Sequence, residues 1–241
     1  MSCLVLNSVP IIIPLTLPPL PKQSKARMIQ TFLASLLLIP AVCIAQSELI
    51  NAEIHLAASR ADYATVQSLL DAGENPDQVG ELNNTALIMA VFSADPRMVE
   101  SLIRAGANLN LQGNNMYTAL HAAVHVNSGL CMQLLVSEGA NPNLPDSLGH
   151  TPLHLAASFG NLRATQSLLS AGAKLETMAH GNRTPLLLAA ELGHTMVVKE
   201  LLKRGANPNV VSVWEQTPLN MATAHDYKEI VTLLKTAGAI K

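Results

Sequence analysis

The sequence feature that most constrains the fold is a 33-residue period that runs through most of the chain. A threonine opens the same phrase in five successive units, followed by alanine or proline, then leucine, then more small or apolar residues. The threonines are Thr85, Thr118, Thr151, Thr184 and Thr217. A glycine follows each threonine by 21 residues, and a sixth glycine, Gly73, indicates an earlier unit that begins at Ala52. A fixed period of this size predicts a solenoid of stacked supersecondary units.

Each unit reads as two helices followed by a turn. Thr151 can accept a hydrogen bond from a free amide at a helix start, and Pro152 is tolerated at the first helical position. The first helix is expected to run for roughly eight residues and to end near Gly160. A second helix is predicted over 162–170, ended by Gly172 in a left-handed conformation. Asparagine-rich turns then lead into the next phrase as an extended loop or hairpin, at 75–77, 108–110, 141–143 and 207–209.

This order of elements, together with the Thr-Pro-Leu-His phrase, resembles the ankyrin repeat. The resemblance covers residues 49–241 as six repeats, at about 49–80, 81–113, 114–146, 147–179, 180–212 and 213–241. It implies an all-α solenoid of six helix-turn-helix units joined by short β-hairpin loops. The glycine that usually stands two residues before the threonine is present only as Gly149. Asn83 and Asn182 tolerate the same backbone conformation, whereas Met116 and Glu215 leave the local hairpin geometry open.

The first 45 residues differ from the rest of the chain. All 17 acidic residues lie at Glu48 or later, and the only charged residues before that point are Lys22, Lys25 and Arg27. A basic region, an apolar run over 32–39 and small residues up to Ala45 predict a secretory signal peptide in residues 1–45 that is cleaved after Ala45. We therefore expect export to the periplasm, or secretion, of a domain over 46–241.

Two points about this leader stay open. Translation could start at Met1 or at Met28, and a start at Met28 would leave a signal peptide of ordinary length. The apolar run is too short for a stable membrane span, so no stable insertion is expected after cleavage, although a retained N-terminal anchor is the alternative.

Sequence patterns that carry catalytic chemistry are missing. No glycine-rich phosphate loop follows a strand pattern, no Gly-x-Ser-x-Gly occurs, and paired carboxylates do not recur on one face, so we expect no enzyme and no cofactor. Residues 46–241 carry 12 of the 15 Lys and Arg residues against 17 Asp and Glu residues, which disfavours nucleic-acid binding. Cys131 is the one cysteine after Ala45 and is expected to be a buried core thiol.

Histidines offer the one candidate metal site. His121 and His125 lie four residues apart, a spacing that can chelate a metal on a helix. His121, however, occupies the same repeat position as His55 and His154, where the ankyrin resemblance implies a structural bond to the backbone of the adjacent turn. No metal site is therefore assigned. A metal or haem carrier linked to stress defence, using His121, His125 and His154, remains an alternative.

The positions that the repeat leaves free are the candidates for a binding surface. They lie at the end of each first helix, which by resemblance lines the concave face, and at each hairpin tip. Aromatic residues at such positions suit protein recognition, since aromatic side chains carry much of the energy of interfaces; packing between neighbouring loops is the alternative. The candidate partner-binding residues are Phe92, Tyr117, His125, Phe159, Arg183, Leu192 and Trp214.

The sequence as a whole predicts an exported, non-enzymatic and monomeric protein–protein interaction module. Its protein partner, of unknown identity, would bind through the concave face and the hairpin tips. The chain is similar to exported bacterial periplasmic ankyrin proteins associated with stress defence. A secreted effector that acts on a host protein is the alternative.

Overall fold

The computed structural model describes residues 54–80 and 83–240, which belong to one compact unit, Leu49–Lys241. The predicted signal peptide and its cleavage site at Ala45 lie outside the described residues. Within the described ranges, no helix combines the length and the apolar character that a membrane span needs.

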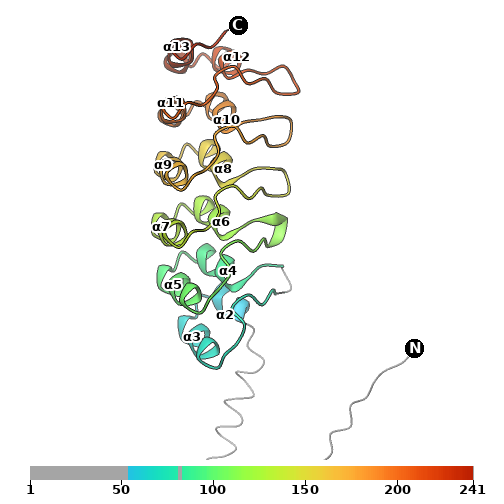
Figure 1. Ribbon diagram of the computed structural model, residues 1–241, viewed down its shortest axis with the longest axis vertical. Coiled ribbons are helices and arrows are strands. Elements are labelled where there is room, and N and C mark those ends of the chain that lie inside the picture. The colour runs from blue at the N-terminus through green and yellow to red at the C-terminus, as the bar shows by residue number, and fades with distance from the viewer. Residues whose placement is uncertain (1–53, 81–82, 241) are drawn as a thin grey trace, which may run out of the picture. The chain divides into compact units, whose positions relative to one another are not determined.

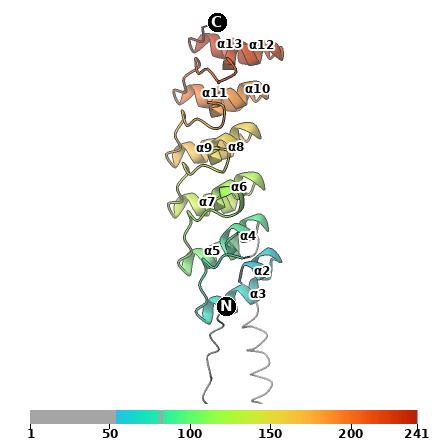
Figure 2. The same cartoon turned by 90° about the vertical axis from the view of Figure 1, so that its right-hand side faces the viewer.

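Helix pairs stack in chain order, one pair per repeat (Figure 1). The first helices of the six pairs are α2 (Ile54–Ser59), α4 (Ala86–Phe92), α6 (Ala119–His125), α8 (Pro152–Ser158), α10 (Pro185–Glu191) and α12 (Pro218–Ala224). The second helices are α3 (Tyr63–Asp71), α5 (Pro96–Arg104), α7 (Gly129–Ser137), α9 (Leu162–Ser170), α11 (Thr195–Lys203) and α13 (Lys228–Thr236). First helices pack on first helices and second helices on second helices along the stack (Figure 2). The predicted all-α solenoid is confirmed.

The threonines of the repeated phrase start the first helices as predicted. Thr118 has an extended backbone, and its Oγ1 accepts a hydrogen bond from the backbone N–H of His121. Thr85, Thr184 and Thr217 make the equivalent bond to the residue three positions on. Proline occupies the first helical position of α8, α10 and α12, where its missing N–H leaves no unsatisfied partner.

Small residues allow the first helices to pack closely. The alanine pairs in the middle of these helices, such as Ala122–Ala123 and Ala156–Ala157, are fully buried, and leucines such as Leu153 and Leu168 fill the space around them. Cys131 in α7 is buried in the same core, as predicted. Burial raises the pKa of its thiol, so the sulfur stays in its unreactive neutral form.

The connecting loops turn tightly and contain no continuous strand in the described ranges. The predicted hairpins are reduced to two isolated antiparallel bridges, Val79 to Thr85 and Ala179 to Arg183. A short 3-10 helix, η1 (Asn114–Met116), lies in the third repeat. Met116 (φ 58°) and Glu215 (φ 59°) adopt the same left-handed conformation as Gly149 (φ 81°). The repeat therefore keeps its loop geometry, at a cost of about 1–2 kcal/mol at each of these non-glycine positions.

Asparagines in the loops join neighbouring repeats. Asn141 Oδ1 accepts from the backbone N–H of Asn143 within its own turn (3.0 Å), as expected of a turn former. Asn143 Oδ1 then accepts from the backbone N–H of Lys174 in the next repeat (2.8 Å). The same inter-repeat bond joins Asp77 to Asn108, Asn110 to Asn141, Glu176 to Asn207 and Asn209 to Ile240. The turns were recognisable in the sequence, whereas these inter-repeat bonds were not foreseen.

Candidate partner-binding surface

Three ring side chains from consecutive repeats lie in contact at the ends of the first helices. Phe92 ends α4, His125 ends α6, and Phe159 follows the last residue of α8. The ring centroid of His125 lies 6.2 Å from that of Phe92 and 5.8 Å from that of Phe159, and both pairs meet edge to face. Leu192 holds the repeat position of Phe159 in the next unit. We call these four residues the apolar row.

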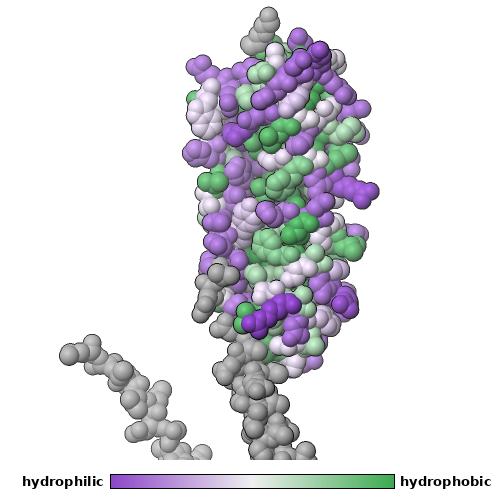
Figure 3. Space-filling model, turned by 180° about the vertical axis from the view of Figure 1, so that it is seen from behind, coloured by the Kyte–Doolittle hydropathy of each residue, from purple (hydrophilic) through white to green (hydrophobic). Residues whose placement is uncertain are grey.

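The apolar row is accessible. The exposed fractions are 37% for Phe92, 51% for Phe159 and 46% for Leu192, and His125 is also exposed. Viewed from behind, the stack carries a band of hydrophobic side chains along its length, with hydrophilic side chains on either side (Figure 3). Four of the predicted partner-binding residues thus form one exposed surface. The ring contacts within it are partly the inter-repeat packing that was the alternative interpretation.

A hollow of about 690 Å³ adjoins the middle of the apolar row. His125 and Phe159 line it, together with Asn127 and Asn161 from the turns that follow α6 and α8 and Arg163 from the first turn of α9. Asn161 Nδ2 donates to Asn127 Oδ1 (2.7 Å), which fixes both amides. The hollow is therefore apolar on one side and hydrogen-bonding on the other.

The remaining predicted residues, Tyr117, Arg183 and Trp214, lie in the loops and make no ring contact with the row in the described ranges. Tyr117 is half-buried and stacks on His121, with ring centroids 5.1 Å apart. Burial and the charge of Asp146 raise the pKa of the Tyr117 phenol. Trp214 is 54% exposed and lies over Gly181, where an added Cβ would stand 2.3 Å from the indole ring.

Arg183 differs from the other predicted residues because its charge is already paired. Its guanidinium forms an ion pair with Glu191 at the end of α10, and both side chains are about three-quarters buried. Desolvation lowers the pKa of Arg183. An arginine held in this way braces the loop against α10, so the structure favours a structural role for Arg183 over direct contact with a partner.

Two buried histidines connect repeats. His121 Nδ1 accepts from the backbone N–H of Thr118 (3.1 Å), and its Nε2 donates to the carbonyl of His150 in the next repeat (3.0 Å). His154 bonds Thr151 and the carbonyl of Arg183 in the same way. Burial lowers the pKa of both imidazoles, that of His154 to about 4. Because both ring nitrogens of each histidine are engaged, neither can bind a metal without breaking the repeat junction.

Metal ligands do not gather elsewhere in the part of the chain that the structure describes. No group of three His, Cys, Asp or Glu side chains there could hold a metal ion. The alternative of a carrier built on His121, His125 and His154 therefore gains no support from the geometry.

Comparison with known proteins places this architecture in a family. The family profile for ankyrin repeats in three copies matches residues 54–146, 87–179, 125–212 and 153–241. The chain belongs to the ankyrin-repeat family. Among solved structures, it is similar to an ankyrin repeat domain from Acinetobacter baumannii AYE, with 30% identity and a TM-score of 0.73. The alignment covers 78% of this chain and 98% of that domain. A search of curated proteins finds no match.

Ankyrin repeats are generally protein–protein interaction modules and typically non-enzymatic scaffolds. In this ankyrin array, the structural role that the resemblance implied for His121 and His154 is confirmed by their bonds to the next repeat.

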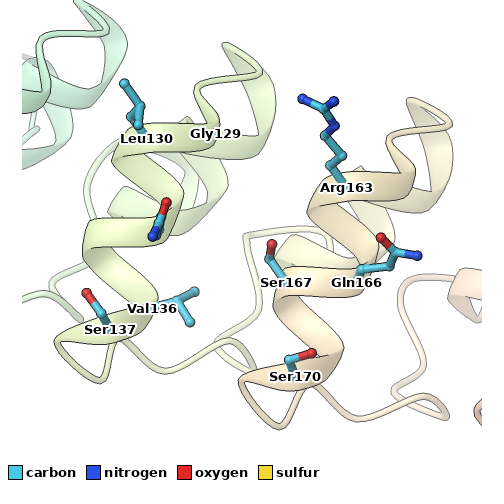
Figure 4. Close-up of a pocket in the computed structure, with 9 residues that line it drawn as sticks. Gly129, Leu130, Val136, Ser137, Arg163, Gln166, Ser167 and Ser170 are labelled. Atoms are coloured by element: carbon cyan, nitrogen blue, oxygen red, sulfur yellow. The ribbon is translucent and has the colours of Figure 1, made fainter.

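A second hollow, of about 760 Å³, lies between the second helices α7 and α9 (Figure 4). Val136 and Ser167 point toward each other across it, while Leu130 and Arg163 project from the first turns of their helices. Leu130 is 64% exposed, although its place in an apolar second helix did not indicate that it faces outward. Helix α7 has no aromatic or charged side chain that would specify a ligand here.

Proposed function

We propose that this chain is an exported interaction module that binds a protein partner along the apolar row, with Tyr117 and Trp214 extending the surface into the loops. The observation that carries the proposal is the contact of three exposed rings from three consecutive repeats. Aromatic side chains that meet on a solvent-facing surface provide large apolar area for a partner to cover.

A rigid scaffold favours binding at this position. The first helices are fixed at their starts by threonine caps and by the histidine junctions, so the ends that carry the row are presented in one arrangement. A surface that is ordered before binding loses less conformational entropy when the partner docks. Less of the free energy gained by burying the apolar row is therefore offset by ordering of the protein.

The export part of the proposal rests on the leader. The basic residues before an apolar run and the small residues before Ala45 support cleavage and release into a bacterial periplasm. Expression of the full chain with a C-terminal tag, followed by osmotic shock, should release a product that begins at Gln46. An uncleaved chain retained in the cytoplasm would contradict export. Recovery of the cleaved chain mainly from the culture medium would favour secretion over the periplasm.

The binding part is tested by comparing variants in one capture experiment. The tagged full chain is expected to retain a specific protein from a periplasmic extract, identified by mass spectrometry. Phe92→Ala combined with Phe159→Ala should lose that protein while its circular dichroism melt stays nearly unchanged. Leu130→Ala, which truncates an exposed apolar residue on α7, is the control and should retain it. Equal capture by all three proteins would contradict the proposed surface. A large drop in melting temperature of the double variant would assign the rings a structural role instead.

A further inference from the structure

A cation without a counter-ion lies beside the apolar row. Arg163, in the first turn of α9, lines the same hollow as His125 and Phe159. Among the described residues, no carboxylate lines that hollow. Within the described ranges, four of the six arginines pair with an acidic side chain, and only Arg60 and Arg163 do not. Arg60 holds in the first repeat the position that Phe159 holds in the fourth, so both unpaired arginines lie along the row.

The hollow also presents a free hydrogen-bond donor. Asn127 uses its side-chain oxygen to accept from Asn161 Nδ2, so its own NH₂ group remains available to a ligand. The side-chain oxygen of Asn161 is in turn occupied by the backbone N–H of Ala164 (3.0 Å). Side-chain hydrogen bonding in the hollow is thus dominated by donors, and a ligand that fits it must supply acceptors.

Neighbouring acidic groups do not neutralise this site. In the repeats on either side, the carboxylates at the ends of the first helices and in the turns that follow are Asp95, which pairs with Arg97, and Glu191, which pairs with Arg183. Although the chain as a whole has more acidic than basic residues, no acidic side chain among the described residues lines the hollow. Among the described side chains that line the hollow, Arg163 is the one that is permanently charged.

We infer that the segment bound by the apolar row is a peptide segment of the partner that combines apolar side chains with an Asp or Glu side chain. The apolar side chains cover Phe92, Phe159 and Leu192, and the carboxylate accepts hydrogen bonds from Arg163 and Asn127. Arginine and a carboxylate form strong charge-assisted hydrogen bonds, and such complementarity selects partners. This inference rests on the proposed function and specifies the class of partner.

A displayed library of random peptides of about 16 residues, embedded in a carrier so that chain ends do not contribute, tests the inference. Selection on the full chain should enrich Phe, Leu or Trp together with Asp or Glu. An enriched sequence is then synthesised with blocked ends, and its Kd is measured by fluorescence anisotropy. Arg163→Glu should weaken binding about tenfold, because an attraction at the rim becomes a repulsion. Lys199→Glu, on the exposed face of α11, is the matched control and should leave the Kd unchanged. Selection repeated on Arg163→Glu should enrich Lys or Arg in place of the acidic residue.

Different failures have different meanings. Enriched peptides that need Phe92 and Phe159 but carry no acidic residue, and that bind Arg163→Glu equally well, would overturn this inference and leave the proposed function intact. Enriched peptides indifferent to Phe92→Ala with Phe159→Ala would overturn both. A concentration-dependent dimer that the same double variant dissolves would identify a second copy of the chain as the occupant, and would also overturn the inference.

Discussion

The two ends of helix α6 carry the same residue type in opposite settings. His121 at the start is buried, with both ring nitrogens bonded to backbone, whereas His125 at the end is exposed between the rings of Phe92 and Phe159. The start of each first helix builds the junction to the next repeat. The end also contacts neighbouring repeats, since Ser93 Oγ donates to the Ala58 carbonyl and His194 Nε2 bonds the Ser158 carbonyl, but its outer side chains stay exposed. His121 therefore belongs to the buried starts of the first helices, which we call the scaffold end. His125 belongs to their exposed ends, which carry the apolar row and which we call the presented surface.

Other repeats vary the scaffold end within a narrow range. Ile88 and Leu187 hold the position of His121 in α4 and α10 and are fully buried. The junction therefore accepts either an apolar side chain of similar size or a histidine that bridges to the next loop. The helix ends accept residues as different as Phe92, His125 and Glu191.

Alanine substitution of the two histidines should give the greatest contrast in stability. His121→Ala should lower the free energy of unfolding by about 3 kcal/mol, because it leaves a cavity and unpairs a buried carbonyl and a buried N–H group. His125→Ala should change it by less than about 0.5 kcal/mol, as expected of an exposed residue. Urea denaturation followed by circular dichroism measures both. Equal losses for the two variants would remove the distinction between the ends of α6.

Acid should reduce the stability that His154 contributes at the start of α8. The pKa of His154 is lowered from 6.5 to about 4 in the folded chain, mainly by desolvation, so between these values the unfolded chain binds a proton that the folded chain does not. The contribution of the neutral imidazole to stability is then fully present above pH 6.5 and falls as the pH drops toward 4. Through His154 alone, the free energy of unfolding is expected to fall by about 2 kcal/mol between about pH 7 and pH 5.

Substitution of the same residue isolates this effect from other titrations. His154→Leu, which copies Leu187 at the same position of the next repeat, should show a pH dependence that is smaller by that amount. Parallel urea titrations at about pH 7 and pH 5 measure it. A pH dependence identical to that of the wild type would show that His154 is not responsible for the acid sensitivity.

Relief of backbone strain in the loops should raise stability, by less than the histidine substitutions lower it. Met116→Gly and Glu215→Gly should each raise the free energy of unfolding by about 0.5–1 kcal/mol, because relief of the left-handed strain exceeds the entropic cost of glycine. Gly149→Ala should have the reverse effect, since its added Cβ would stand 3.2 Å from Ala179 Cα. Thermal melts of the three variants test whether the repeat imposes this conformation. Destabilisation by Met116→Gly would argue that the methionine side chain contributes more than its backbone costs.

The presented surface should contribute least to stability. Phe92→Ala and Phe159→Ala are each expected to lower the free energy of unfolding by about 1 kcal/mol or less, because their rings are partly exposed and meet His125 edge to face. A loss as large as that of His121→Ala would place Phe92 or Phe159 in the scaffold.

Local signals in the sequence were sufficient to predict the helices and turns of the repeat. Threonine caps, the helix over 162–170 and the left-handed glycines follow from the preferences of single residues within one repeat, and the structure has them where they were predicted. The ion pair of Arg183 with Glu191 and the bonds from the loop asparagines to the next repeat depend on how elements meet in space. The period reveals which positions are equivalent but not which side chains face each other, so neither the pairing of Arg183 nor the lack of an acidic partner for Arg163 could be predicted from it.

The affinity of the captured partner for three variants of similar thermal stability decides whether binding resides at the helix ends. If it does, Phe92→Ala with Phe159→Ala should weaken the Kd by about a hundredfold or more, in line with the loss of two aromatic anchors. Trp214→Ala at the loop tip should weaken it by less, and Leu130→Ala on α7 should leave it unchanged. A Kd within about threefold of the wild type for the double variant, measured by isothermal titration calorimetry, would contradict binding at the helix ends.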